Sequence, residues 1–139
     1  MSRRLNYRDV EVGDEAPRID HKLTRGDLVK YAGASGDFNP MHTDEVAATA
    51  AGLPSVFGHG MFTMGLLGTA LTNYAGIGNL VSYRVRFTKQ TWPDEMLSTR
   101  IVVAAKREED GRRLLELECS VANAEGQVKV EGTAVAVAE

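Results

Sequence analysis

The sequence predicts an α+β fold in which an antiparallel sheet wraps around one long central helix, and two observations lead to this prediction. The stretch from Gly60 to Leu71 is apolar on nearly all sides, which is typical of a buried helix. From Leu80 onward apolar and polar residues alternate with a period of two, which is typical of strands with one apolar face. Such a sheet needs a cover and such a helix needs a surrounding layer, so the simplest fold lets each bury the other.

Length and composition fit a single domain, residues 1–139. The chain is 43% hydrophobic and 25% charged, and its net charge of -3 excludes a broad electrostatic attraction to nucleic acid or anionic lipid. Its one cysteine, Cys119, rules out an internal disulfide and suits a reducing compartment. Because Cys119 falls at an inward position of an expected strand, we expect it in the core.

No signal peptide or membrane span is expected. The N-terminal Met1–Arg4 is not followed by an apolar run, as a signal peptide would be. The apolar stretch at 60–71 is too short to cross a bilayer. We therefore expect a soluble cytoplasmic protein that binds neither nucleic acid nor membrane.

The N-terminal half predicts mostly helices. In order, we expect a turn at 11–14, a strand over 19–23, a helix from the capping box of Thr24 and Asp27 to about Ala34, a helix over 45–51, and the apolar helix from Met61 to about Tyr74. Leu28, Tyr31 and Ala32 lie at helical spacing and should form the buried stripe of the first helix. Gly65 and Gly68 carry no side chain, which favours close contact between the apolar helix and the sheet.

The C-terminal half predicts four antiparallel strands. Their alternating patterns cover about 80–88, 97–106, 115–121 and 128–137. Glu109–Gly111 and Ala124–Gly126 carry the residues of tight hairpin turns.

A carboxylate, Asp37, and an imidazole, His42, lie five residues apart between the first two helices. Gly36 lets the backbone bend, Pro40 fixes φ, and Asn39 is kept out of the helical conformation by the proline that follows it. We expect a rigid elbow that aims both side chains at one point, as proton transfer at two adjacent carbons requires. The alternative is a turn whose polar residues only bond their own backbone.

A second candidate lies at Gly58–Gly60, which leads into the apolar helix. Helix N-termini present free N–H groups and a partial positive charge. The amide of Gly60 or Met61, with His59 beside it, would therefore stabilise a developing oxyanion. The alternative is a glycine-rich turn with His59 half exposed.

A metal site is a further possible use of the histidines. His42, Asp44 and His59 have the ligand types of a zinc site, but a cysteine pair, a His-x3-His motif and an acidic cluster are all missing from the sequence. We therefore expect no metal and no other cofactor.

The elbow resembles the hydratase-2 signature of the MaoC-like family, in which an aromatic and small residues precede Ser-Gly-Asp-x-Asn-Pro-x-His. The resemblance spans nearly the whole chain, with similar blocks at Val12–Asp14, Leu23–Asp27, His59–Met61 and Phe87–Pro93. The chain departs from the family where Gln90 and Thr91 replace Pro-Val, where Asp94 replaces Gly, and where Gly68 stands at the place of a serine that some members carry. These departures affect the expected shape of the substrate channel and leave the elbow intact.

The resemblance implies a single hotdog domain over 1–139, paired with itself or with a related hotdog subunit. The chain is particularly similar to the short B-type catalytic subunits of (3R)-hydroxyacyl-carrier-protein dehydratases. The implied activity is that of a hydro-lyase of fatty-acid metabolism, which interconverts trans-2-enoyl and (3R)-3-hydroxyacyl thioesters of coenzyme A or acyl carrier protein. The alternatives are a hotdog acyl-CoA thioesterase and a non-catalytic acyl-binding partner subunit.

The resemblance also assigns roles to residues. In dehydration His42 would remove the α-proton, the Gly60 amide would take the enolate charge, Asp37 would handle the departing hydroxyl, and Asn39 would orient the water or the loop. Which of Asp37 and His42 serves which carbon stays open at this point. The basic residues Arg84, Arg86, Lys89 and Arg100 fit a solvated outer face of the sheet, or, for the first three, a grip on the phosphates of a phosphopantetheine carrier.

Overall fold

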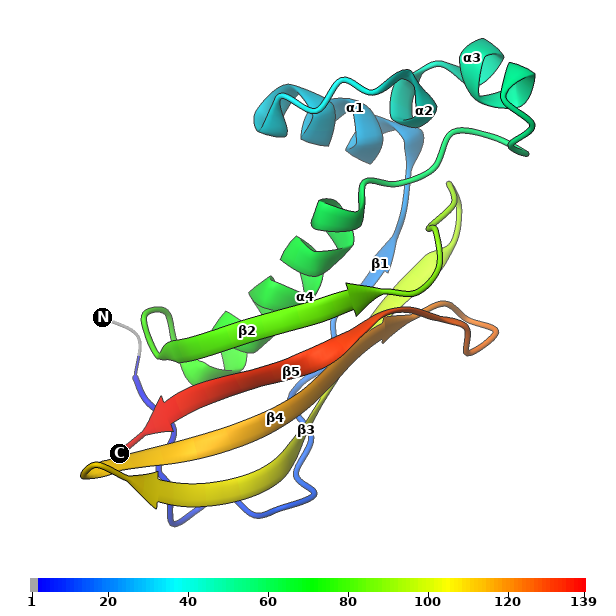
Figure 1. Ribbon diagram of the computed structural model, residues 1–139. Helices are drawn as coiled ribbons and strands as arrows, with labels where there is room; N and C mark the ends of the chain where they lie inside the picture. Colours follow the sequence, from blue (N-terminus) through cyan, green and yellow to red (C-terminus); the bar gives the residue numbers. More distant parts are fainter. Residues whose placement is uncertain (1–2) are drawn as a thin grey trace.

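A computed structural model describes residues 3–139, so Met1 and Ser2 of the expected domain 1–139 lie outside the described residues. The elements are β1 (Asp20–Lys22), α1 (Arg25–Ser35), α2 (Pro40–Thr43), α3 (Glu45–Ala50), α4 (Gly60–Ala75), β2 (Leu80–Phe87), β3 (Met96–Glu109), β4 (Arg112–Ala122) and β5 (Val128–Ala138). The strands form one antiparallel sheet that curves around α4, while α1, α2 and α3 lie at the N-terminal end of α4 (Figure 1). The predicted α+β arrangement of a sheet around a helix is confirmed.

The sheet has the order β1-β3-β4-β5-β2, which places β2 at one edge. The hairpin between β3 and β4 turns through Asp110 and Gly111, which both have positive φ angles, 51° and 77°. Two such residues are what a two-residue type I′ turn requires, because its twist matches that of the flanking strands. The hairpin between β4 and β5 turns at Gly126, with φ 79°. Both predicted hairpins are confirmed.

The core lies between α4 and the inner face of the sheet, to which β2, β3, β4 and β5 all contribute contacts. Its fully buried side chains include Leu67, Leu71, Leu97, Ile101, Leu115, Leu117 and Val121. Cys119 is buried among them, and burial raises the pKa of its thiol to about 11. The thiol is therefore protonated at neutral pH, and the predicted core position of Cys119 is confirmed.

The predicted burial of α4 on all sides was wrong for the single chain. Met61, Gly65, Thr69 and Asn73 are exposed and recur every four residues, so they form one stripe along the helix. The sheet covers the opposite face, where Leu67 and Leu71 lie. Apart from its chain neighbours and the helix's own backbone, no atom in the described part of the chain lies within 4 Å of where a Cβ on Gly65 would stand, whereas one on Gly68 would lie 3.5 Å from the Tyr83 ring. The expected close approach to the sheet therefore occurs at Gly68 alone.

The one helix that the sequence analysis missed is α2. Pro40, which was expected to fix φ in the elbow, occupies the first turn of α2, where its fixed φ suits a helix and its lack of an N–H costs nothing. His42 is therefore part of a helical turn and not of an irregular loop.

Candidate active site

The elbow begins where α1 ends. Thr24 and Asp27 form the predicted capping box at the start of α1, and Leu28 and Ala32 bury one face of the helix. Gly36 ends it in the left-handed region, with φ 77°, and donates its N–H to the Ala32 carbonyl. A residue without a Cβ takes this conformation at no steric cost, so the chain reverses sharply before Asp37.

Two local hydrogen bonds then shape the elbow. The Asn39 N–H donates to Asp37 Oδ1 at 3.2 Å, and the Met41 N–H donates to Asn39 Oδ1 at 3.1 Å. The second bond makes Asn39 the N-cap of α2. The side chain of Asn39 is therefore engaged in holding the loop, which is one of the two roles that the sequence analysis allowed it.

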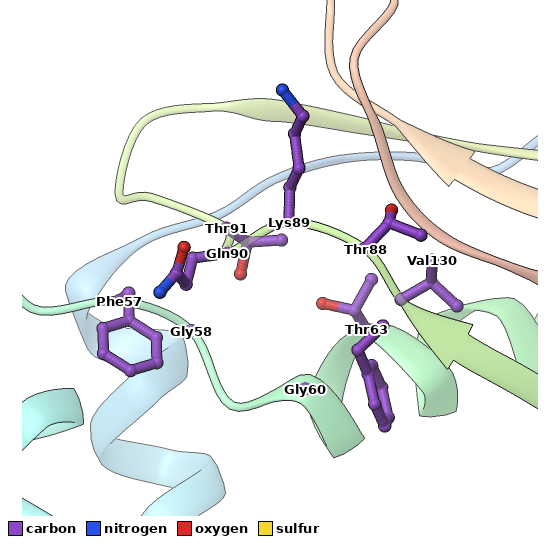
Figure 2. A pocket seen from close by; sticks show the side chains of 10 residues that line it. Phe57, Gly58, Gly60, Thr63, Thr88, Lys89, Gln90, Thr91 and Val130 are labelled. Carbon is purple, nitrogen blue, oxygen red and sulfur yellow. The ribbon is translucent and has the colours of Figure 1, made fainter.

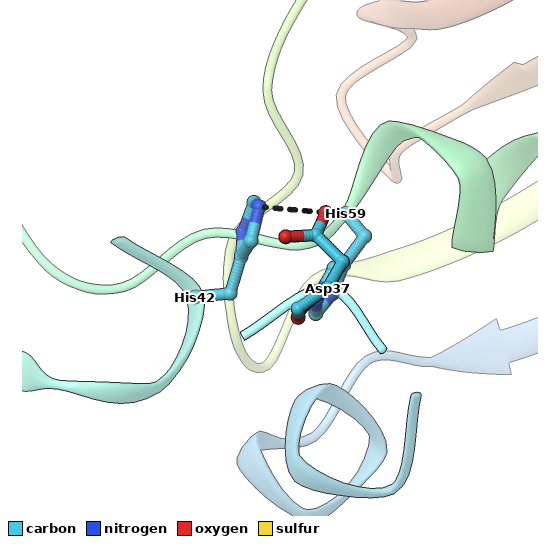
Figure 3. Close-up of side chains that lie close together, drawn as sticks. All are labelled: Asp37, His42 and His59. Carbon is cyan, nitrogen blue, oxygen red and sulfur yellow. Dashed lines mark hydrogen bonds and ion pairs between the residues drawn. The ribbon is translucent and has the colours of Figure 1, made fainter. Parts of the chain in front are cut away.

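His42 is 8% exposed and points toward Asp37. Its Nδ1 lies 2.6 Å from the carbonyl oxygen of Phe57. A carbonyl can only accept, so Nδ1 carries the hydrogen and the neutral ring has its lone pair on Nε2. Nε2 lies 3.9 Å from Asp37 Oδ2. Figure 3 marks this approach with a dashed line. That separation is too long for a direct hydrogen bond. Nε2 and Oδ2 therefore face the same space, and both remain available to a substrate.

His59 contacts both Asp37 and His42. It is 2% exposed, which excludes the half-exposed turn, and it is the N-cap residue of α4. Its Nε2 donates to the backbone carbonyl of Asp37 at 3.0 Å, and its ring stacks on His42 with the centroids 3.9 Å apart. The Tyr31 ring meets His59 edge-on at 4.9 Å. His59 thus fixes the positions of both Asp37 and His42.

The three side chains also resemble a metal-ligand set. One ligand atom each from Asp37, His42 and His59 lies within 4.8 Å of the others. The acidic member differs from the one considered in the sequence, because Asp44 caps α3 by accepting from the Ala47 N–H. The donor types suit zinc, so metal dependence needs a direct test.

A cavity of about 350 Å³ lies on the other side of the segment that contains Gly58 and Gly60 (Figure 2). Its lining residues are Phe57, Gly58, Gly60, Thr63, Phe87, Thr88, Lys89, Gln90, Thr91 and Val130. Phe57 links the cavity to the elbow, because its ring also packs against His42 with the centroids 4.8 Å apart. A Cβ on Gly60 would stand 3.1 Å from the Phe87 ring, so a side chain here would crowd the cavity.

The N-terminus of α4 lies between the elbow and the cavity, because His59 bonds Asp37 and Gly60 lines the cavity. The first N–H groups of a helix have no partner within it, and within the described residues the His59 side chain caps none of them. The amides of Gly60 and Met61 therefore remain available to an acceptor, aided by the helix dipole. The Met61 side chain itself is 55% exposed.

The three candidate phosphate-binding residues lie on β2 and on the loop directly after it. Lys89 borders the cavity, and Figure 2 shows its side chain extending away from it. Arg84 and Arg86 lie exposed on the edge strand β2, and Arg86 is opposite Glu131 of β5.

An ion pair that no sequence pattern predicted lies beneath the cavity loop. Lys129 is 2% exposed, and its Nζ lies 3.0 Å from Glu95 Oε1 and 2.8 Å from the Gln90 carbonyl oxygen. Burial favours a higher pKa for Glu95, but hydrogen bonds from Asn123, Lys129 and the Trp92 N–H outweigh it and lower that pKa. Lys129 stands between two valines in the sequence, and that pattern carries no sign of a buried ammonium.

Comparisons with known proteins identify the family and the fold. Residues 11–124 match the family described as MaoC like domain. The 3-hydroxyacyl-thioester dehydratase Y of Mycobacterium tuberculosis is 40% identical over 123 residues, covering 85% of this chain and 41% of that protein. The 3-hydroxybutyryl-CoA dehydratase of Methylorubrum extorquens is 28% identical over 133 residues, covering 94% of this chain and 82% of that protein. The unliganded R-hydratase PhaJ1 from Pseudomonas aeruginosa superposes with a TM-score of 0.87 at 24% identity, covering 100% of this chain and 90% of that one.

The sheet around a helix is thus the hotdog fold, as the resemblance implied. The chain belongs to the MaoC-like family. It spans 41% of the length of its M. tuberculosis relative. Across residues 3–139 no helix has both the length and the apolar character to cross a membrane.

Proposed function

We propose that this protein catalyses the (R)-specific hydration of trans-2-enoyl thioesters, and the reverse dehydration of (3R)-3-hydroxyacyl thioesters, in fatty-acid metabolism. The observation that carries the proposal is the 3.9 Å approach of His42 Nε2 to Asp37 Oδ2 beside the free amides of α4. Hydration of a conjugated double bond needs a proton donor and acceptor at two adjacent carbons and a stabiliser for the enolate oxygen. The names of the two dehydratase relatives support the same reaction.

In the dehydration direction, His42 Nε2 takes the proton from the α-carbon. The electron pair of that C–H bond moves into an enolate, whose negative oxygen accepts a hydrogen bond from the Gly60 amide at the start of α4. When the enolate collapses, the C–O bond at the β-carbon breaks and the hydroxyl leaves with a proton from the Asp37 carboxyl group. A proton then returns from His42 to Asp37 by way of water, because Asp37 is exposed and the 3.9 Å between Nε2 and Oδ2 is too long for a direct transfer.

The direct test is a panel of trans-2-enoyl-CoAs of increasing length, followed by the loss of the enoyl absorbance. We expect turnover, a (3R)-3-hydroxyacyl product on chiral chromatography, and no release of free thiol. Free thiol without a 3-hydroxyacyl thioester product would identify a thioesterase instead. No reaction with any chain length would overturn the proposal and favour a non-catalytic acyl-binding subunit.

Treatment with a chelator tests whether the activity depends on a bound metal ion. The proposed proton transfers use only side chains and a backbone amide, so prolonged treatment with EDTA and passage through a desalting column should leave the rate unchanged. A loss of activity that zinc restores would assign Asp37, His42 and His59 to a metal instead.

We further propose that Lys89, Arg84 and Arg86 attract the phosphates of the carrier, whether coenzyme A or acyl carrier protein. All three side chains are exposed on β2 or directly after it. We also propose a hotdog pair, with itself or a related subunit, because β2 has an open edge among residues 3–139 and α4 has an exposed stripe. A cytoplasmic location fits the single buried thiol of Cys119.

A further inference from the structure

Unpaired buried polar atoms gather at one place in this molecule. Among residues 3–139, three buried side-chain atoms have no hydrogen-bond partner: His59 Nδ1, Thr63 Oγ1 and Thr91 Oγ1. All three belong to the start of α4 or to the loop that faces it. A buried hydroxyl without a partner costs about 1–3 kcal/mol, so two in one place call for an explanation.

The two hydroxyls converge on the cavity beside the active site. Thr63 is 1% exposed and Thr91 is 3% exposed, and both line the cavity. Figure 2 shows their oxygen atoms directed into the space between α4 and the loop after β2. Gly58 makes this arrangement possible, because a Cβ there would stand 2.2 Å from Thr91 Oγ1.

The loop that carries Thr91 is held firmly in place. The Gly58 N–H donates to the Thr91 carbonyl at 2.8 Å, and the buried Lys129 ammonium donates to the Gln90 carbonyl. The backbone of Thr91 is therefore fixed, and with it the direction in which its side chain leaves the loop. A purely hydrocarbon ligand would leave both hydroxyls unpaired, whereas an oxygen or amide group of a ligand would pair them.

Resting on the proposed function, we infer that Thr63 and Thr91 form a hydrogen-bonding subsite for a hydroxyl or carbonyl oxygen of the thioester substrate, several bonds away from the reacting carbons. The shared wall of Phe57 and Gly60 places the subsite next to the position of the thioester carbonyl. The oxygen belongs either to a substituent on the acyl chain or to an amide of the pantetheine arm. The chemistry of recognition is the same for both sources.

The test measures the dissociation constants of three saturated thioesters by calorimetry. The probes are hexanoyl-CoA, 6-hydroxyhexanoyl-CoA and S-ethyl hexanethioate, which lacks the pantetheine arm. None has a double bond to hydrate, so the result does not depend on whether the proposed hydration occurs. The variants are Thr63→Val and Thr91→Val, which replace a hydroxyl by a methyl group of similar size. Thr69→Val is the matched control, because Thr69 is exposed on the same helix and its hydroxyl already donates to the Gly65 carbonyl.

Loss of one hydrogen bond should weaken binding about 3- to 10-fold. If the acyl chain supplies the oxygen, both variants weaken 6-hydroxyhexanoyl-CoA and leave hexanoyl-CoA unchanged. If the arm supplies it, they weaken both CoA probes equally and leave S-ethyl hexanethioate unchanged. The inference is overturned if neither variant differs from Thr69→Val, if all three probes weaken equally, or if the wild-type protein binds none of them.

A second measurement guards against a folding defect. Because valine is close to threonine in size and shape, the ligand-free Thr63→Val and Thr91→Val proteins should stay folded, with unfolding midpoints close to that of Thr69→Val. A lowered midpoint in both variants would show that the hydroxyls stabilise the fold, and it would overturn the inference.

Discussion

His42 is held through two different parts of its ring. Its Nδ1 is bonded to the Phe57 carbonyl, which leaves the lone pair on Nε2, and its face is stacked on His59. Asp37 is held through its backbone carbonyl and through Oδ1, which leaves Oδ2 toward the histidine. In each of these two residues one side-chain atom, Nε2 or Oδ2, thus remains available for proton transfer, while the other polar atoms hold the residue in position.

At this scale we predict that Asp37→Asn and His42→Ala each lower kcat/KM for a short enoyl-CoA by about 10²–10⁴-fold, since each removes one proton-transfer group. Circular dichroism should show that both variants remain folded. Two variants with near-normal turnover would contradict the assignment.

The two variants should also differ from each other in a way that assigns the carbons. If His42 serves the α-carbon, Asp37→Asn should still exchange the α-proton of a 3-hydroxyacyl-CoA with deuterium oxide, because it can form the enolate but cannot expel the hydroxyl. His42→Ala should exchange none. Nuclear magnetic resonance of the recovered substrate measures the exchange, and the opposite pattern would reverse the two roles.

At the scale of elements, the segment at 57–60 leads into α4, and it contacts both the elbow and the loop after β2. On one side it bonds His42 and Asp37, and on the other it lines the cavity. Gly58 has no room for a side chain because Thr91 Oγ1 occupies the position that a Cβ would take. The loop stays in place through Lys129 and Glu95 below it.

We therefore predict that Gly58→Ala lowers the free energy of unfolding by about 1–3 kcal/mol, as overpacking of a filled interior does. Thr91→Ala removes the clashing oxygen, so the double variant should regain most of the loss. The measurement is a double-mutant cycle, in which urea unfolding gives the free energy of unfolding of the wild type, both single variants and the double variant. Equal stability of Gly58→Ala with and without Thr91→Ala would mean that the clash is relieved elsewhere.

The ion pair of Glu95 and Lys129 gives a second prediction for this element. Glu95→Gln leaves the buried Lys129 charge without its counter-ion and should cost about 3 kcal/mol at pH 7. Glu15→Gln is the control, because its pair with Arg100 is exposed and should contribute less than about 1 kcal/mol.

The same pair predicts a pH dependence. The folded pKa of Glu95 is lowered, so its stabilisation is present above the ordinary glutamate pKa of about 4.3 and is lost as the pH falls through the lowered value. The difference in unfolding free energy between wild type and Glu95→Gln should therefore shrink below about pH 4. A difference that stays constant from pH 7 to pH 3 would contradict the pairing.

At the scale of the whole molecule, the single chain leaves two surfaces uncovered. The outer edge of β2 carries unpaired backbone groups in the described chain, and Val81, Met61 and Phe87 are 45%, 55% and 50% exposed nearby. A second hotdog domain would cover the strand edge and the apolar side chains together.

We predict a dimer of the 15.1 kDa chain, or a pair with a related subunit, by size-exclusion chromatography with light scattering at micromolar concentration. Val81→Lys should shift the protein toward the monomer, because it places a charge at the edge of the strand. Val46→Lys, which changes an exposed residue of α3, should leave the mass unchanged. An active wild-type monomer would rule the pair out as a requirement.

Much of this arrangement could be predicted from the sequence because it depends on local chemistry. The alternation of apolar residues located β3 and β4, the capping box located α1, and Asp110–Gly111 located a hairpin. The elbow could be predicted because Gly36 permits a left-handed turn and Pro40, four residues later, fixes φ. The stacking of His59 on His42 and the burial of Lys129 depend on segments distant in the sequence, so no spacing revealed them.

The two bonds at the elbow run from opposite directions, since the side chain of His42 reaches the backbone of Phe57 and the side chain of His59 reaches the backbone of Asp37. The elbow and the start of α4 are therefore cross-linked into one rigid unit, while Thr91, Gln90 and Lys89 stand on a separate loop. The side chains of Lys89 and Gln90 make none of the bonds that position Asp37 and His42, so changes to these two residues should alter which thioesters bind more than they alter proton transfer. Thr91 is less free to change, because its carbonyl bonds the Gly58 N–H.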